Sequence, residues 1–415
     1  MPLPDLHVQG LTSGYAHSVP EVYGQSERSA LRAVAVQFFV NGALFASFVP
    51  RLPEIRDRIG VSVAGIGALL SIAGVLGLVG SAVASHAITR IGTRNVILAA
   101  GALLSMSLAV VGLATVPAVL LVGLSLMMAF DALVDIAMNM QGSWLSARRH
   151  TPVMSRLHGL WSLGALVGGV ASSRVADAGV SLPAHLLVAA GLLLVVIGVV
   201  GPGLLRDDET ATQSESPPDR GDANGMASSS RVTLLLFLVI GFTAAAMEST
   251  SFDWAAFRLT DDLGTSAGFA ALGYAAVMGG MTLGRFAGDW GKARLGQDRL
   301  NSLSVTMTAT GLAVASFVPN RFLIVAGYLL AGLGIASLLP SVYDTAAKRP
   351  GRPGAGLGAL TAGLRVAILV VPFAIGGIAG SHLSVGTAVA IVALPSAIIF
   401  LLMTVNPRYI RTRHT

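Results

Sequence analysis

Residues 62–115 read SVAGIGALLSIAGVLGLVGSAVASHAITRIGTRNVILAAGALLSMSLAVVGLAT. Two apolar runs, 62–87 and 95–115, flank a short turn that carries Arg90 and Arg94. A helix needs roughly 20 mostly apolar residues to cross the hydrocarbon core of a bilayer. This stretch therefore predicts two membrane-crossing helices that are joined by a basic turn.

The same pattern continues in both directions along the chain. The predicted spans are 31–53, 62–87, 95–115, 117–146, 157–178, 182–204, 232–257, 267–289, 300–319, 321–346, 355–380 and 384–405. We predict an all-α integral membrane protein with 12 transmembrane helices in two six-helix bundles. The predicted order is a tail (1–30), a first bundle (31–205), a polar flexible linker (206–230), a second bundle (231–405) and a tail (406–415).

Composition supports a membrane protein, because 53% of the residues are hydrophobic and only 12% are charged. Soluble domains carry about 25% charged residues. The absence of cysteine excludes disulfides, thiolate metal sites and cysteine nucleophiles. Most of the 27 Lys and Arg residues fall in the loops on the side of the termini. We therefore expect a multi-pass protein of the plasma (inner) membrane with both termini cytoplasmic, and no nucleic-acid partner.

A short sequence repeat relates the two halves. Arg90-Ile91-Gly92 follows the second predicted span, and Arg294-Leu295-Gly296 follows the eighth. Such repeats are typical of transporters whose substrate site lies between the halves near the membrane midplane. The alternative is that Arg-x-Gly is only a short turn.

These residues resemble a known motif. The Arg90, Gly92, Arg94 pattern, and Gly284-Arg285 with Gly288-Asp289, look like the cytoplasmic loop motif of the major facilitator superfamily. The resemblance implies a monomeric transporter in which Arg90, Arg94, Arg285 and Asp289 help to hold the cytoplasmic side closed. The first copy departs from the motif, because Thr89 stands where the family usually has aspartate.

The predicted span 117–146 carries Asp131, Asp135 and Asn139 at helical spacing, which places them in one polar stripe. A charge at the bilayer centre costs roughly 2.5–3.5 kcal/mol on insertion scales. Two close carboxylates in a low dielectric do not both ionise easily, which suits a proton carrier. The alternative is a structural stripe that is bridged to arginine or water.

This segment also resembles the fucose–proton symporter branch of the superfamily. That branch has an acid-x-Ala-x-Asn pattern in its fourth helix, and Asp135, Ala137 and Asn139 match it. The branch also has an aspartate in helix one, four residues before a proline. Ala46, which precedes Pro50, stands at that place.

Other polar residues in apolar spans complete a candidate site. Glu248 is a third candidate for proton coupling, placed in the outer half of the membrane, whereas Asp253 and Trp254 are expected to anchor the outer interface. The candidate substrate-binding residues, each of which has a purely structural alternative, are Gln37, Asn41, Asn139, His158 and Trp161.

The arginines in the spans are expected to form charge pairs. Arg365 requires a carboxylate partner, for which Asp344 and Asp135 are the candidates. Arg285 is assigned to the loop motif near the cytoplasmic end.

The sequence thus predicts a proton-coupled secondary transporter of a small polar solute, sugar-like or a related metabolite. A drug or metabolite exporter is an alternative, because Gly164 to Gly169 resembles an antiporter motif that has proline where Ala165 stands. A non-transporting receptor or scaffold is the alternative of another class. No enzyme, metal site or cofactor is predicted. The G-x-S-x-G letters at Gly264–Gly268 match a hydrolase motif, but they fall in a loop between two membrane helices and not after a strand.

Overall fold

The computed structural model describes residues 21–149, 151, 153–206, 231–347 and 355–405, and this part of the chain is almost entirely helical. The first set of elements is α1 (Glu21–Phe48), η1 (Val49–Arg51), α2 (Leu52–Ile59), α3 (Val63–Leu113), α4 (Pro117–Arg148), α5 (Met154–Asp177), α6 (Leu182–Val200) and η2 (Gly201–Gly203). The second set is α7 (Arg231–Phe252), α8 (Ala255–Leu263), α9 (Ala267–Leu295), α10 (Gln297–Phe317), α11 (Arg321–Ile335), α12 (Leu338–Ala347), α13 (Ala355–Ala379) and α14 (Val385–Thr404).

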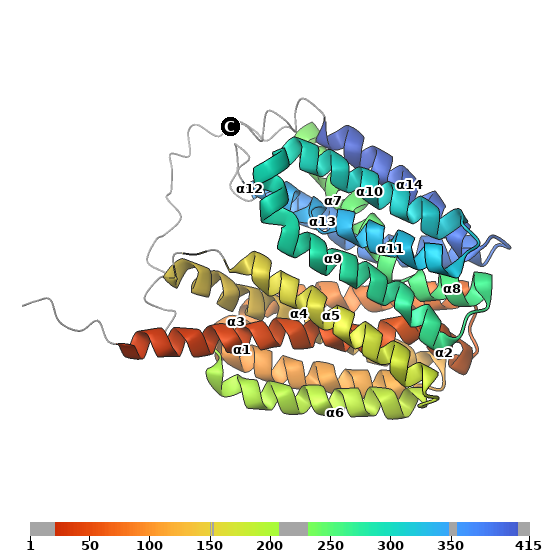
Figure 1. The fold of residues 1–415 in the computed structure, drawn as a ribbon. Helices are drawn as coiled ribbons and strands as arrows, with labels where there is room; N and C mark the ends of the chain where they lie inside the picture. The colour runs from red at the N-terminus through yellow and green to blue at the C-terminus, as the bar shows by residue number, and fades with distance from the viewer. Residues whose placement is uncertain (1–20, 150, 152, 207–230, 348–354, 406–415) are drawn as a thin grey trace, which may run out of the picture.

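The two sets form two halves that lie one above the other in Figure 1. Within each set the helices pack mainly on one another, and the halves meet where α5 packs on α9 and α3 packs on α13. We call the face where α1 begins and α14 ends the terminal face, and the face that holds α2 and α8 the opposite face.

Helices cover all the predicted spans, but three predicted spans are broken. The first breaks at Phe48, where Pro50 and Pro53 follow, because proline cannot donate the backbone hydrogen bond of a helix interior. The seventh breaks after Phe252, and the tenth breaks after Ile335. The breaks in the first and seventh predicted spans produce the short helices α2 and α8.

The two halves repeat each other in backbone conformation. Gly92, at the turn inside α3, has φ 81° and ψ 159°, and Gly296, between α9 and α10, has φ 74° and ψ 162°. Gly60 and Gly264 end α2 and α8 in the left-handed conformation. The number of residues between Gly60 and Gly264 equals the number between Gly92 and Gly296. Positive φ favours glycine, so the repeated Arg-x-Gly letters mark a required turn.

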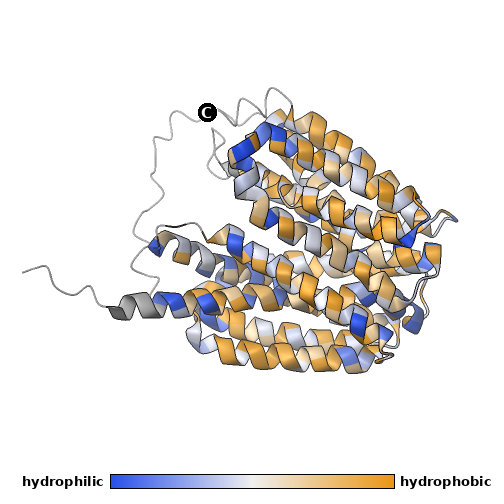
Figure 2. Cartoon of the chain, viewed as in Figure 1, coloured by the Kyte–Doolittle hydropathy of each residue, from blue (hydrophilic) through white to orange (hydrophobic). Residues whose placement is uncertain are grey.

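The lengths of the helices are mainly apolar in the view of Figure 2, and the polar residues gather towards the helix ends. On α6 the outward stripe is exposed Val188 (62%), Leu192 (62%), Val195 (63%) and Val199 (74%). Soluble monomers rarely expose such continuous apolar surface, whereas lipid covers it without cost. Nine helical segments of the described chain are long and apolar enough to cross a membrane. The more polar α5 and α10 are not among these nine, and α3 alone covers two predicted spans.

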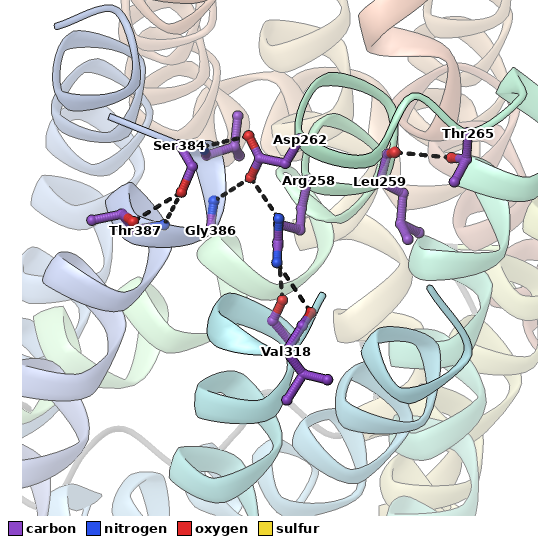
Figure 3. Close-up of polar contacts among 10 residues, drawn as sticks. Arg258, Leu259, Asp262, Thr265, Val318, Ser384, Gly386 and Thr387 are labelled. Carbon is purple, nitrogen blue, oxygen red and sulfur yellow. Dashed lines mark hydrogen bonds and ion pairs between the residues drawn. The ribbon is translucent and has the colours of Figure 1, made fainter. Parts of the chain in front are cut away.

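Buried charges fasten α8 to its own half (Figure 3). The Arg258 guanidinium donates to the carbonyl oxygens of Ala315 (3.0 Å) and Val318 (3.3 Å), at the end of α10. It also pairs with Asp262 at 2.9 Å. Asp262 accepts the backbone N–H of Gly386 (2.8 Å), at the start of α14. One ion pair of α8 thus bonds to the free carbonyl groups at the end of α10 and to a free N–H group at the start of α14, which holds α8 on both helices.

Candidate functional site: a cavity between the halves

A cavity of about 360 Å³ lies between the two halves. Ligand sites in proteins have volumes of roughly 300–1,000 Å³, so this space suits a small solute. The polar side chains that line it come from α1, α4, α5, α7, the turn after α7, and α9. They are Asn41, Asp131, Asp135, His158, Trp161, Glu248, Ser249, Asp253, Tyr274 and Arg285.

A chain of hydrogen bonds joins three helices at one wall of the cavity. The Trp161 Nε1–H of α5 donates to Asn41 Oδ1 of α1 at 2.8 Å. The Asn41 amide in turn donates to Asp131 Oδ1 of α4 at 2.9 Å. The three side chains were each predicted to be functional, and the structure brings them together. Their mutual bonds fix the direction in which the Asp131 carboxylate faces the cavity.

Asp135 lies one turn further along α4 and is exposed to the cavity. Its carboxylate accepts the side-chain amide of Asn139 at 2.9 Å. Arg365 of α13 is close enough to interact electrostatically with both Asp131 and Asp135. However, Arg365 belongs to none of the four ion pairs in the described part of the chain. The predicted Arg365–Asp135 attraction is therefore present without direct contact.

Arg285 lies in the cavity wall, so its assignment to the loop motif at the end of the helix was wrong. It donates to Ser162 Oγ and, at 3.1 Å, to the carbonyl oxygen of His158. Its guanidinium carbon lies 5.7 Å from the centre of the Trp161 ring. The long side chain reaches from α9 across to α5, which sequence position alone does not reveal. Arg285 thus connects the two halves at the cavity.

The acids of α7 also face the cavity. Glu248 interacts electrostatically with Arg285, and Ser249 donates to Asp253 Oδ2 at 2.6 Å. The prediction that Asp253 and Trp254 anchor an outer interface was wrong. Trp254 is completely buried and packs on Phe257, with ring centres 5.1 Å apart. The break after Phe252 explains this result, because it turns the chain inward where a continuous helix would have continued outward.

A second cavity of about 540 Å³ lies towards the terminal face. It shares His158 and Arg285 with the first cavity, so these two side chains stand between the two spaces. Lys292 and Tyr343 also line it. At the opposite face, by contrast, Arg56 of α2 forms an ion pair with Asp261 of α8, which joins the halves. The four ion pairs in which both partners are described residues lie in this opposite-face layer.

Several predicted site residues lie elsewhere. Gln37 is buried on α1 and does not line the cavity, and Asn139 contacts the cavity only through Asp135. Arg90 is exposed at the turn of α3, whereas Arg94 donates to the carbonyl oxygen of Gly201 at 3.1 Å. This contact holds the turn against η2 within the first half. The side chains of Asp289 and Asp344 lie outside the described part of the chain.

Sequence reasoning missed the aromatic lining and the serine partners of the charges. Phe45, Phe48, Phe252 and Tyr274 line the cavity. Ser162 receives the Arg285 hydrogen bond. Serines and aromatics are common in membrane helices, so no signal marks these residues individually. Ser162, one residue after Trp161, could have been found only as part of the polar face of α5.

The serine of the G-x-S-x-G letters has a structural use. Ser266 is the N-cap residue directly before α9, and its hydroxyl accepts the backbone N–H of Phe269 at 3.2 Å. Within the described residues, no group of three or more His, Asp or Glu side chains could hold a metal ion.

Comparisons with known proteins agree with this geometry. A family model for the Major Facilitator Superfamily matches residues 34–372. An uncharacterized MFS-type transporter of Yersinia pestis is 29% identical over 351 residues, which cover 82% of this chain and 87% of that protein. The membrane protein MosC of Rhizobium meliloti is 26% identical over 327 residues, 77% of this chain and 76% of that protein.

Two solved structures share the fold. The nucleoside transporter NupG has a TM-score of 0.70 at 13% identity and covers 90% of this chain and 98% of its own. A bacterial homolog of the human lysosomal transporter Spinster, in an inward-facing and occupied conformation, has a TM-score of 0.62 at 14% identity, over 96% of this chain and 98% of its own. The chain is therefore a multi-pass membrane transporter that belongs to the major facilitator superfamily.

Proposed function

We propose that the protein is a proton-coupled secondary transporter that moves a small polar solute by alternating access. The central observation is a solute-sized cavity that is lined by carboxylates of both halves. An inter-half ion pair lies on one side of this cavity and a second, larger space on the other. With the terminal face in the cytoplasm, this arrangement corresponds to an inward-facing state.

In this proposal Asp135, Asp131 and Glu248 carry the proton, and Asn41, His158 and Trp161 contact the solute. Asp135 is exposed to the cavity and lies near Asp131, so the pair is best satisfied when one proton is shared between them. Arg365 and Arg285 interact electrostatically with these carboxylates, which allows the balance of charge to change when a proton or solute binds.

The proposed topology follows the same geometry. The halves 31–205 and 231–405 rock about the cavity, with 12 crossings, both termini in the cytoplasm and a monomer in the bacterial inner membrane. The positive charge of the loops near the termini supports this orientation. When the closed face opens, the open face closes, so the cavity is exposed to one side of the membrane at a time.

The likeness to the fucose–proton branch is supported only in part. The Asn139–Asp135 hydrogen bond supports the match in α4. Ala46, in contrast, is fully buried beside Gly168 and carries no ionisable group. Because α1 provides no carboxylate at this position, we propose that the proton path runs through Glu248 instead of through α1.

Proton flux in proteoliposomes that hold a pH-sensitive dye tests the proposal. A solute from a panel of sugars and small metabolites should trigger a pH change, and Asp135→Asn should abolish it, because the amide cannot bind the proton. Glu27→Gln, at a carboxylate of α1 that does not line the cavity, is the matched control and should leave the flux unchanged. A solute-driven pH change that persists in Asp135→Asn would refute the assigned proton site.

A further inference from the structure

Asp253 differs from the other carboxylates of the cavity in its electrostatic surroundings. Asp131 and Asp135 both interact with Arg365, and Glu248 interacts with Arg285. For Asp253 the charged neighbour is Glu248, which has the same sign. Ser249 donates one hydrogen bond to Asp253 Oδ2 and provides no charge. Asp253 is thus the cavity carboxylate that has no arginine among its charged neighbours in the described part of the chain.

The charges of the whole cavity point in the same direction. Four carboxylates line it, and Arg285 is the arginine that lines it with them. Arg365 adds one further positive charge behind the α4 wall. Even with one proton shared between Asp131 and Asp135, the ionised carboxylates outnumber the two arginines. A neutral or anionic solute would leave this excess of negative charge in place, whereas a cationic solute would reduce it. Low local dielectric makes this difference in charge energetically important.

The remaining lining at Asp253 also suits a cation. Phe252 and Tyr274 meet edge to face with ring centres 6.2 Å apart, and both line the cavity beside Asp253. Phe45 and Phe48 line the same space, with ring centres 5.9 Å apart. Aromatic faces attract ammonium groups, and a carboxylate accepts the hydrogen bonds that an ammonium donates. The Trp161 N–H and one of the two amide N–H groups of Asn41 are already used in the wall itself.

We propose that the transported solute carries a protonated amine, and that Asp253, with Phe252 and Tyr274, forms the subsite that binds this ammonium group. The inference rests on the proposed function and names its substrate class, an amine-bearing polar solute. Glu248, on the same side of the cavity, adds negative potential to the subsite. The proton-coupling pair on α4 remains separate from it.

Matched solutes test the charge requirement. Glucosamine, N-acetylglucosamine, glucose and glucuronate share a sugar ring and differ in charge or in the amine. Ethanolamine provides a protonated amine without a ring, and choline provides a quaternary ammonium that has no N–H to donate. Binding is measured by the rise in Tm of the purified protein and by isothermal titration. We expect a response to one or more of the amines and none to the neutral or anionic members. A response to the neutral sugars that equals or exceeds the response to the amines would overturn the proposal.

The absence of cysteine in the natural chain permits a second test that needs no substrate. In Phe252→Cys, the single thiol reacts with cationic and anionic methanethiosulfonate reagents, and the ratio of the two rates reports the local potential. Adding Asp253→Asn should lower this cation-to-anion ratio at least about fivefold. Adding Asp57→Asn, at the exposed carboxylate of α2, should not change it. An unchanged ratio with Asp253→Asn would overturn the proposal even if no panel member binds.

The two proposals fail in different ways. Proton flux that is driven by a neutral sugar and abolished by Asp135→Asn would retain proton coupling and reject the amine subsite. Amine binding that is lost in Asp253→Asn, without any amine-driven pH change, would retain the subsite and reject proton coupling. Ser249→Ala removes the neighbouring hydroxyl and keeps the charge, so it should retain amine binding where Asp253→Asn loses it.

Discussion

Asn41 is the residue on which the polar wall of the cavity depends, because its side chain bonds to both Trp161 and Asp131. Asn41→Ala leaves the indole N–H and the carboxylate without this partner. Leaving a buried polar group unpaired costs about 1–3 kcal/mol. We therefore expect solute-driven flux at low solute concentration to fall by roughly fivefold to a hundredfold, measured in proteoliposomes at equal protein density.

Gln37→Ala is the matched control for this prediction. Gln37 lies one turn earlier on α1, is equally buried and does not line the cavity. Its removal should affect Tm more than flux per folded protein. Equal flux losses in the two variants would show that Asn41 acts through packing of α1 and not through the cavity.

For individual residues, the sequence predicted those cavity residues whose charge has a high free-energy cost in a membrane helix. Asp131, Asp135 and Glu248 were found because a charge in an apolar helix requires a functional or structural reason. Asp253 and Arg285 were placed wrongly for two different reasons. The position of Asp253 depends on a helix break, and that of Arg285 on a long side chain that crosses to another helix.

At the scale of elements, the apolar runs were sufficient to locate the helices, and the Arg-x-Gly letters located two of the turns. The breaks were not predicted, because each falls inside a stretch that is apolar enough overall to be taken as one span. Proline marks the break after Phe48, whereas no proline follows Phe252 closely. There the short helix α8 is fixed by tertiary contacts, chiefly those of Arg258 and Asp262.

The Arg258–Asp262 pair should therefore stabilise the second half strongly. The two side chains are only 8% and 11% exposed. Breaking a buried ion pair by removal of one partner costs about 3–5 kcal/mol, since the other charge remains buried. Asp262→Ala should lower Tm in detergent markedly and reduce the yield of folded protein.

Asp57→Ala provides the comparison for this element. Asp57 also pairs with an arginine, but its side chain is 64% exposed. Exposed pairs contribute only about 0–1 kcal/mol, so this variant should unfold close to the wild-type temperature. A similar Tm for both variants would contradict the view that the pair anchors α8 to α10 and α14.

At the scale of the whole molecule, the opposite face is closed by two short helices, each anchored to its own half. Arg51, almost fully buried, donates to the carbonyl oxygen of Val180 at 3.2 Å and so ties η1 to the α5–α6 loop. Arg258 ties α8 to α10. The ion pair that links the halves at this face, among the described residues, is the two-pronged Arg56–Asp261 pair, where Arg56 also lies over the Phe257 ring at 5.4 Å. Ser173 adds a hydrogen bond to the carbonyl oxygen of Gly268 at 2.7 Å.

Rocking of the halves must separate these groups, so Arg56 and Asp261 should set the balance between the two open states. A coupling of about 1–3 kcal/mol shifts such a balance about 5–150-fold. In Ile368→Cys, the single thiol lies in the cavity, and Arg56→Asp or Asp261→Arg should speed its labelling by an impermeant reagent applied to the opposite face. The double change restores opposite charges and should return labelling towards the Ile368→Cys rate. Equal labelling in all four proteins would show that apolar packing, and not this ion pair, holds the opposite face closed.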